Sequence, residues 1–307
     1  MKNPICDQLA IFQPTGSEYE NARSWYIVNS VLNGFLIISA IILNSVTVQA
    51  VRKTSSLSKP LKALLLNLAV CDLGVGLLVE PLYFGLLVKW LQRDNSTDAT
   101  CTSFLSILYL FSAASCLGVM ALSVDRFLAV HLHLRYNELV THKRIFAMVI
   151  SIWMFSAFLS LFHLWVSANV FYMLITVVGV VYLVFSTMLY FKIYFAVRRH
   201  KNQIRAVQVQ VAQVGETANA ARLKKSAVGV FYVYLAFLLC YLPKLSSFVI
   251  IVISGFSLGV KIFCTFATIL LFLNSSLNPV IYCWKMRHIR RAVLMYLQGT
   301  TKESFCE

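Results

Sequence analysis

Charged residues are scarce in this chain, and acidic ones are the scarcest. Only 12 of the 307 residues are Asp or Glu, and all charged residues together reach 13%, whereas hydrophobic residues reach 59%. Soluble domains carry about 25% charged and roughly 45–50% apolar residues. A soluble protein of this composition would expose large apolar patches. The composition therefore excludes an ordinary soluble protein and indicates a chain that is embedded in a membrane.

The sequence also lacks the patterns on which most enzymes and transporters depend. It contains no cluster of metal ligands, no nucleophilic triad and no phosphate-binding loop. We therefore expect neither an enzyme nor a cofactor beyond a simple ion. A transporter or a channel is the main alternative for a membrane protein. Inverted repeats and helices broken by glycine or proline are common in transporters, and the sequence has neither.

Long apolar stretches show where the chain crosses the membrane, because a spanning helix needs about 20 apolar residues. Residues 1–24 lack the apolar core of a secretory signal peptide, so we expect the first span to act as its own insertion signal. Five stretches meet the length requirement with at most two charged residues each: Tyr26–Val51, Ala63–Val88, Thr102–Val124, Ser226–Gly255 and Ile262–Trp284.

A sixth stretch, Ile145–Phe191, is ambiguous because it runs for 47 residues without Asp, Glu, Lys or Arg. One helix of this length would extend about 70 Å, more than twice the apolar thickness of a bilayer. It must therefore fold as two spans, with the polar patch Ser167-Ala168-Asn169 as the predicted turn. The total is then seven spans.

The distribution of basic residues supports this count. With seven spans, 21 of the 27 basic residues lie in three connections and a tail on one side of the membrane, which the positive-inside rule places in the cytoplasm. The net charge of +15 thus indicates membrane topology and not nucleic-acid binding. We expect a plasma-membrane protein with an extracellular tail (1–25), a seven-span domain (26–284) and a cytoplasmic segment (285–307). Its first part, Lys285–Leu297, is basic and amphipathic.

Several polar residues lie inside the spans, where each needs a reason; hydrogen bonding between helices is the simplest one. Together with other residues they form a pattern that resembles the rhodopsin-like (class A) G-protein-coupled receptors over nearly the full chain. The matching residues are Asn44, Leu68-Ala69-Val70-Cys71-Asp72, Cys101, Asp125-Arg126-Phe127, Trp153, Phe237-Leu238-Leu239-Cys240-Tyr241-Leu242-Pro243 and Asn278-Pro279-Val280-Ile281-Tyr282.

The resemblance implies an all-α membrane protein with a seven-transmembrane helix bundle and a short amphipathic eighth helix. It implies a receptor that transmits an extracellular signal to heterotrimeric G proteins, with arrestin as a further candidate partner. The implied sodium site comprises Asp72, Ser115, Asn274, Ser275 and Asn278. The implied coupling residues are Asp125, Arg126, Leu134, Tyr136, Tyr190 and Tyr282. A receptor fold that binds a ligand without coupling is the alternative, which Arg126, Tyr190 and Tyr282 oppose.

The chain departs from the family pattern at several positions. Leu223 stands where many relatives carry an acidic residue that restrains Arg126, so we expect some basal activity. Tyr182 replaces the usual proline of the fifth span, and the usual loop cysteine between the fourth and fifth spans is missing. In lacking this proline and this cysteine, the chain resembles the melanocortin, cannabinoid and lysophospholipid receptors. The sequence of the segment 134–141 instead resembles that of the adenosine receptors.

Three cysteines lie on or near the expected outer face, where oxidation is permitted. Because Cys6, Cys101 and Cys264 are odd in number, at most one bridge forms among them, between Cys6 and either of the others, or none forms. Asn95 begins an Asn-Ser-Thr glycosylation sequon in an outer loop. Cys306 is a candidate for palmitoylation, with a free thiol as the alternative.

The residues expected to line a ligand pocket argue against some ligands. Amine receptors of the family carry an aspartate where this chain has Leu108. Adenosine receptors carry an asparagine at the position of Phe248 and a histidine at that of Phe272, and opsins carry a retinal-binding lysine at the position of Phe272. We predict a ligand site formed by Glu80, Leu108, Tyr109, Ser112, Tyr241, Lys244, Phe248, Thr268 and Phe272. The intramembrane Lys244 either anchors an acidic ligand group, with Glu80 as its partner when the pocket is empty, or extends toward the surface.

Overall fold

A computed structural model gives the fold of the protein and describes residues 13–54, 57–94, 98–132, 136–207, 214–255 and 257–297. Four residues that the sequence analysis singled out lie outside this range: Cys6, Asn95, Leu134 and Cys306.

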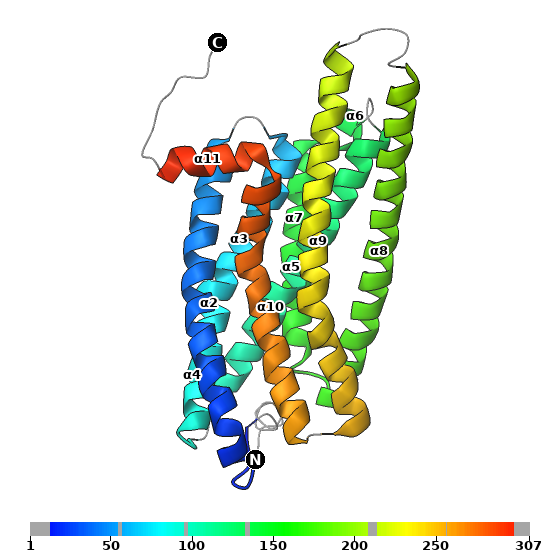
Figure 1. Cartoon of the computed structure of the whole chain (residues 1–307). Helices are drawn as coiled ribbons and strands as arrows, with labels where there is room; N and C mark the ends of the chain where they lie inside the picture. Colours follow the sequence, from blue (N-terminus) through cyan, green and yellow to red (C-terminus); the bar gives the residue numbers. More distant parts are fainter. Residues whose placement is uncertain are drawn as a thin grey trace.

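The described residues form helices and no strands, and the helices pack side by side as a bundle (Figure 1). Seven segments are long and apolar enough to cross a membrane, as predicted; one of them combines α3, η1 and α4. The elements are α2 (Tyr19–Lys53), α3 (Lys59–Gly74), η1 (Val75–Val79), α4 (Glu80–Leu91), α5 (Asp98–Leu132), α6 (Tyr136–Leu139), α7 (His142–Phe162), α8 (Ala168–Val207), α9 (Val214–Ser254), α10 (Leu258–Lys285) and α11 (Arg287–Leu297).

The ambiguous stretch folds as two spans, α7 and α8, which confirms the predicted split. The five residues between them, 163–167, make the turn, slightly before the predicted patch at Ser167-Ala168-Asn169. The turn comes early because His163 ends α7: its Nδ1 lies 2.7 Å from the carbonyl oxygen of Ser160. The backbone N–H of Leu164 then bonds to the carbonyl of Leu161, which closes a tight turn.

Helix α2 begins at Tyr19, seven residues before the predicted span, because Glu18 organises the chain ahead of it. The Glu18 carboxylate accepts hydrogen bonds from the backbone N–H and the hydroxyl of Thr15, both at 2.9 Å. The same carboxylate forms a salt bridge of 2.7 Å with Lys261 on α10. The segment before the first span is thereby fastened to the last span, at the end of the bundle where the N-terminus lies, here called the N-terminal end (Figure 1).

The second span contains one turn of π-helix, η1, just before Pro81. Glu80 donates its backbone N–H to the carbonyl of Val75, five residues earlier, instead of four. A proline clashes with the preceding turn and removes a hydrogen bond, and an inserted residue of this kind relieves the clash. The wider turn sets the direction in which the Glu80 side chain points.

Close helix contacts and buried hydrogen bonds hold the bundle together. A Cβ atom on Gly74 would lie 2.0 Å from the ring of Phe111, so α3 and α5 approach as closely as glycine permits. The indole of Trp153 on α7 donates to the Asn67 side chain on α3 at 2.9 Å. Small residues and side-chain hydrogen bonds are the usual means of joining helices in lipid.

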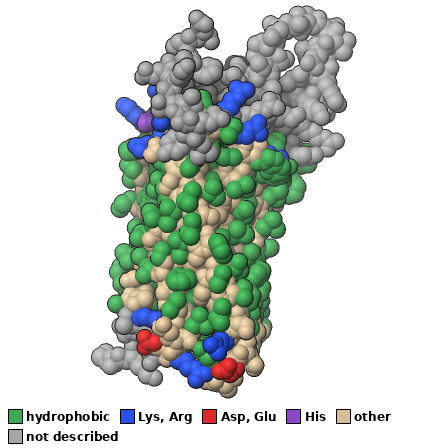
Figure 2. Space-filling model, turned by 60° about the vertical axis from the view of Figure 1, so that its left-hand side comes forward, with side chains coloured by type: hydrophobic (Ala, Val, Ile, Leu, Met, Phe, Trp, Pro, Cys, Tyr) green, Lys and Arg blue, Asp and Glu red, His purple; other side chains and the backbone are tan. Residues whose placement is uncertain are grey.

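The surface agrees with a membrane-embedded bundle. Figure 2 shows apolar side chains along the middle of one face and charged ones gathered at its two ends. Helix α11 crosses the end opposite the N-terminus (Figure 1), with Ile289 buried and Arg290 exposed. It corresponds to the predicted eighth helix but starts at Arg287, because Met286 takes an extended conformation and ends α10.

The Glu18–Lys261 salt bridge predicts a pH-dependent stability. The hydrogen bond from Lys261 lowers the pKa of Glu18 from 4.5 to about 2. The stabilisation is therefore complete above pH 4.5 and is lost as the pH falls toward 2. Replacement of Glu18 by Gln should reduce the stability at pH 7 by about 1–3 kcal/mol, because it weakens a charged hydrogen bond. Thermal unfolding of the purified protein at a series of pH values measures this.

The matched control is Glu20→Gln, because Glu20 is 74% exposed and its salt bridge with Arg93 is longer, at 3.4 Å. Exposed pairs contribute little, so this variant should unfold like the unmutated protein. Equal melting temperatures for the Glu18 and Glu20 variants at neutral pH would contradict the stabilising role of Glu18.

Candidate functional site

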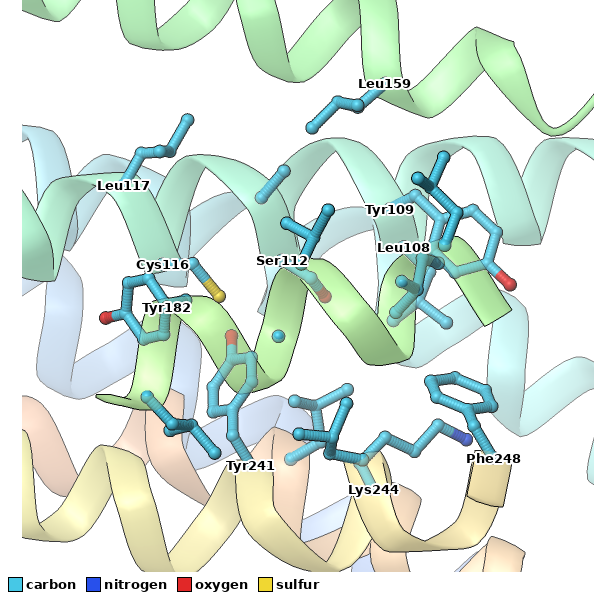
Figure 3. A pocket seen from close by; sticks show the side chains of 18 of the residues that line it. Leu108, Tyr109, Ser112, Cys116, Leu117, Leu159, Tyr182, Tyr241, Lys244 and Phe248 are labelled. Carbon is cyan, nitrogen blue, oxygen red and sulfur yellow. The ribbon is translucent and has the colours of Figure 1, made fainter. Parts of the chain in front are cut away.

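A cavity of about 240 Å³ lies inside the bundle, between α5, α7, α8 and α9. Figure 3 shows Tyr241 and Lys244 on α9 facing Ser112 and Cys116 on α5 across this space. Six of the nine predicted ligand residues line the cavity. They are Leu108, Tyr109, Ser112, Tyr241, Lys244 and Phe248.

The lining residues of α9 follow the helical repeat. Phe237, Tyr241, Lys244 and Phe248 are spaced so that they share one face of a helix, and all four line the cavity. The rings of Phe237 and Tyr241 stack with their centroids 3.9 Å apart. This face of α9 therefore forms one continuous wall of the cavity.

Lys244 supplies a positive charge to this wall. Its Nζ donates a hydrogen bond to the hydroxyl of Thr268 on α10 at 3.0 Å and lies 5.4 Å from the centroid of the Phe248 ring. Thr268 thus belongs to the site through Lys244. Lys244 points into the bundle and is half-buried, so the alternative in which it extends toward the surface is wrong.

Besides Thr268, two predicted ligand residues, Glu80 and Phe272, do not line the cavity. The Phe272 ring packs against Tyr83, with centroids 5.3 Å apart, and is fully buried on that side of α10. Glu80 is completely buried, and neither of its carboxylate oxygens has a hydrogen-bond partner within the described residues. The predicted pairing of Glu80 with Lys244 is therefore wrong, because Lys244 bonds to Thr268 instead.

Several lining residues were not predicted, and most of them come from α7 and α8. Phe155 and Leu159 on α7, and Val178 and Tyr182 on α8, face the cavity. The sequence around them is apolar on every side, so no helical periodicity separates a cavity-facing residue from a lipid-facing one. Of these four residues, only Tyr182 stood out in the sequence, because it replaces the proline that is usual in the family.

A second polar site lies around Asp72, deep in the bundle. The Asp72 side chain is buried and accepts a hydrogen bond of 2.9 Å from the amide of Asn278 on α10. The Ser275 hydroxyl lies within hydrogen-bonding reach of the same carboxylate. Among the described residues, three buried side-chain oxygens on α3 and α10 lack a donor: the second carboxylate oxygen of Asp72 and the amide oxygens of Asn274 and Asn278. Ser115 is buried beside Cys71, the neighbour of Asp72.

The third site lies toward the end of the bundle opposite the N-terminus. The Arg126 guanidinium forms a buried salt bridge with Asp125, with Nε 2.9 Å from the carboxylate. The hydroxyl of Tyr136 donates to the other carboxylate oxygen at 2.7 Å. Burial raises the pKa of the Tyr136 phenol, so the hydroxyl keeps the proton that it donates. Asp125 is thus held by two partners.

Two tyrosines lie buried in the same half of the bundle. Tyr190 on α8 forms a hydrogen bond of 2.6 Å with Ser123 on α5 and stacks on Tyr234, with ring centroids 4.1 Å apart. The Tyr282 hydroxyl on α10 is buried and has no partner within the described residues. Tyr190 is therefore anchored to α5 and α9, while none of the described residues bonds to the Tyr282 hydroxyl.

The cysteines at the N-terminal end divide into two states. Cys101 is disulfide-bonded, whereas Cys264 is a free, buried thiol. Because Cys264 is free, a bridge between Cys6 and Cys264 is excluded. The disulfide at Cys101 fastens the start of α5, the helix that carries Ser112, Ser115 and Arg126.

Comparison with known proteins agrees with this geometry. The family model described as 7 transmembrane receptor (rhodopsin family) matches residues 43–171. The histamine H2 receptor of Cavia porcellus is 28% identical over 288 residues, which cover 86% of this chain and 77% of that receptor.

Two other relatives match over a shorter region. The alpha-2B adrenergic receptor of Didelphis virginiana is 33% identical over 41% of this chain and 33% of that receptor. The adenosine receptor A2b of Gallus gallus is 30% identical over 44% of this chain and 37% of that receptor. Together with the seven spans, these matches show that the chain belongs to the rhodopsin-like (class A) family of seven-transmembrane receptors, which signal through G proteins and are not enzymes.

Proposed function

We propose that the extracellular ligand of this receptor carries an acidic group and that Lys244 binds this group in the cavity. One observation carries the proposal: Lys244 is the only charged residue that lines the cavity within the described part of the chain. A charged side chain in a membrane span costs about 2.5–3.5 kcal/mol on insertion scales and usually has a function. A carboxylate, phosphate or sulfate group on the ligand would offset that cost.

The geometry of Lys244 leaves it able to bind a ligand. An ammonium group has three donors, and Thr268 accepts one hydrogen bond from it. The Phe248 ring lies close enough for a cation–π contact, which helps to hold the ammonium in the cavity. Two donors are then available for the oxygens of an anion.

An amine ligand fits the cavity less well, although two of the relatives are named for amines. Position 108 carries leucine, and no acidic residue lines the cavity in the described structure. An ammonium ligand would therefore meet Lys244 without a counter-charge, and like charges in a medium of low dielectric constant repel strongly.

We further propose that the N-terminus lies outside the cell and that the basic end of the bundle faces the cytoplasm of the plasma membrane. The concentration of 21 of the 27 basic residues on one side supports this orientation. Arg126 would then lie close to the G protein. The Asp125 salt bridge restrains Arg126 at rest, and its opening on activation would release the guanidinium toward the G protein or arrestin.

A sodium ion is the proposed ligand of the Asp72 site. Hard cations prefer oxygen ligands, and the unpaired oxygens of Asp72, Asn274 and Asn278 suit such an ion. Ser115 and Ser275 would complete the set. Bound sodium would neutralise the buried carboxylate and stabilise the resting arrangement of α3 and α10.

The first prediction concerns Lys244. A panel of small carboxylates, phosphates and sulfates is applied to cells that express the receptor, with G-protein activation as the readout. Lys244→Met should reduce the potency of each acidic activator by roughly 10- to 100-fold, the usual effect of a lost charged hydrogen bond. Lys244→Arg keeps the charge and is the control. Activation of the Met variant at unchanged potency would exclude the proposed anchor.

The second prediction concerns sodium. Agonist binding to membranes that contain the unmutated receptor should weaken as sodium replaces potassium, because sodium favours the resting state. Asp72→Asn should remove this dependence while agonist binding itself persists. Binding that does not respond to sodium in the unmutated receptor would overturn the ion site.

The third prediction concerns coupling. Arg126→Ala should abolish G-protein activation while leaving the amount of receptor at the cell surface largely unchanged. Asp125→Asn, which weakens the restraint on Arg126, should instead raise the signal without ligand. If the Ala variant couples fully, Arg126 has no role in activation.

A further inference from the structure

The wall of the cavity between α7 and α8 consists of residues that also face the outside of the bundle. Phe155 on α7 lines the cavity and is 51% exposed. Val178 on α8 lines it as well and is 53% exposed. Both positions lie within the membrane-spanning segments. A single layer of side chains therefore separates the cavity from the membrane-facing surface here, which makes this wall the candidate place for an opening to the bilayer.

The packing of the two helices explains why an opening is expected here. Helix α7 packs against α3 and α5, and α8 packs against α5 and α9, but within the described residues α7 and α8 make few contacts with each other. A Cβ atom on Gly179 would lie 2.7 Å from Leu245, so α8 lies close to α9 here. The two spans are joined only by the short turn at 163–167 and are the least buried of the seven.

Toward the N-terminal end, aromatic side chains close the cavity. Phe171, Tyr172 and Phe248 form a buried cluster there. The rings of Tyr172 and Phe248 stack with centroids 5.2 Å apart, and Tyr109 packs on Phe171 at 4.8 Å. Each of these side chains would have to move before a ligand could enter from the water. Between α7 and α8, by contrast, few contacts within the described residues would have to separate.

We propose that the ligand is a single-chain amphiphile with a small anionic head, of the fatty carboxylate class, and that it enters from the bilayer between α7 and α8. This inference rests on the proposed anion site at Lys244. The head would bind Lys244 inside the cavity, and the hydrocarbon chain would pass between Phe155 and Val178 into the lipid. Both charge and hydrophobicity are then matched along the path.

The size and depth of the cavity support a slender ligand. Its volume of about 240 Å³ is below the roughly 300–1,000 Å³ of typical small-molecule sites, so it holds a head group and part of a chain. Val178 lies ten residues inside α8, which is about 15 Å of helix. The opening therefore lies at the level of the hydrocarbon tails, where a chain would continue into the bilayer.

Binding of radiolabelled dodecanoate to the purified receptor in lipid nanodiscs tests the proposal. Val178→Trp places a bulky ring in the opening and should slow association at least several-fold. The matched control is Val181→Trp, because Val181 is a lipid-exposed valine of α8 that does not line the cavity. Association that is equally fast in both variants would overturn lateral entry.

A second pair of variants works in the opposite direction and guards against misfolding. Phe155→Ala should widen the opening and speed association, whereas Phe158→Ala, at an equally exposed position of α7 outside the cavity, should not. Competition of butyrate, octanoate and oleate with radiolabelled dodecanoate tests the role of the hydrocarbon chain: affinity should rise with the length of that chain. Butyrate that competes as well as oleate would overturn the amphiphile class.

The Lys244→Met variant separates this inference from the proposed function. If dodecanoate binding is lost in that variant but the tryptophan and alanine pairs show no difference, the anion site stands and lateral entry fails. If dodecanoate binds the Met variant unchanged, or does not bind the unmutated receptor, the fatty carboxylate proposal fails, and the small-anion panel then decides on Lys244 alone.

Discussion

A polar group inside the hydrocarbon of a membrane finds no water to bond to, and an unpaired one costs several kcal/mol. This constraint organises the whole bundle. Asp72 and Asn278 join the second span to the seventh, and Lys244 and Thr268 join the sixth to the seventh. The spans that share these bonds meet in a well-packed core, and the second and seventh are the most buried. Helices α7 and α8 bond to their other neighbours, through pairs such as Trp153–Asn67 and Tyr190–Ser123, but they are the least buried of the seven spans, and the cavity lies against both of them.

Several departures from the family pattern lie around the cavity or at the N-terminal end of the bundle. The turn between α7 and α8 has only five residues, too few to form a separate lid, and the aromatic residues of the helices themselves close the end of the cavity. Because Tyr182 replaces a proline, α8 is an unbroken helix, and the Tyr182 side chain faces the cavity. Cys101 keeps a disulfide although the usual loop cysteine is missing. Among the described residues, aromatic side chains of α8 and α9 therefore cover this end of the cavity.

The seven spans could be predicted from sequence because each needs a long apolar run, and charge placement resolved the one ambiguous stretch. The α9 face with Tyr241 and Lys244 was equally predictable, since polar and aromatic residues recur there at helical spacing. The partner of Lys244 could not be predicted from the sequence. Glu80 has the opposite charge, but the π-helical turn before Pro81 points the Glu80 side chain away from Lys244, and no sequence pattern indicates that change of direction. The residues of α8 that line the cavity could not be predicted either. Val178 lines the cavity and Val181 does not, but both are valines in an apolar helix, and only the packing of the neighbouring helices distinguishes them.

If the charge of Lys244 selects the ligand, then reversing that charge should reverse which head group the receptor binds. Binding of dodecanoate and of dodecylamine is measured on the unmutated receptor and on Lys244→Glu, both in lipid nanodiscs. These probes share a chain and differ in the sign of the head group. We expect the Glu variant to lose dodecanoate binding and to gain dodecylamine binding. Dodecanoate that binds the Glu variant as tightly as the unmutated receptor would contradict this expectation.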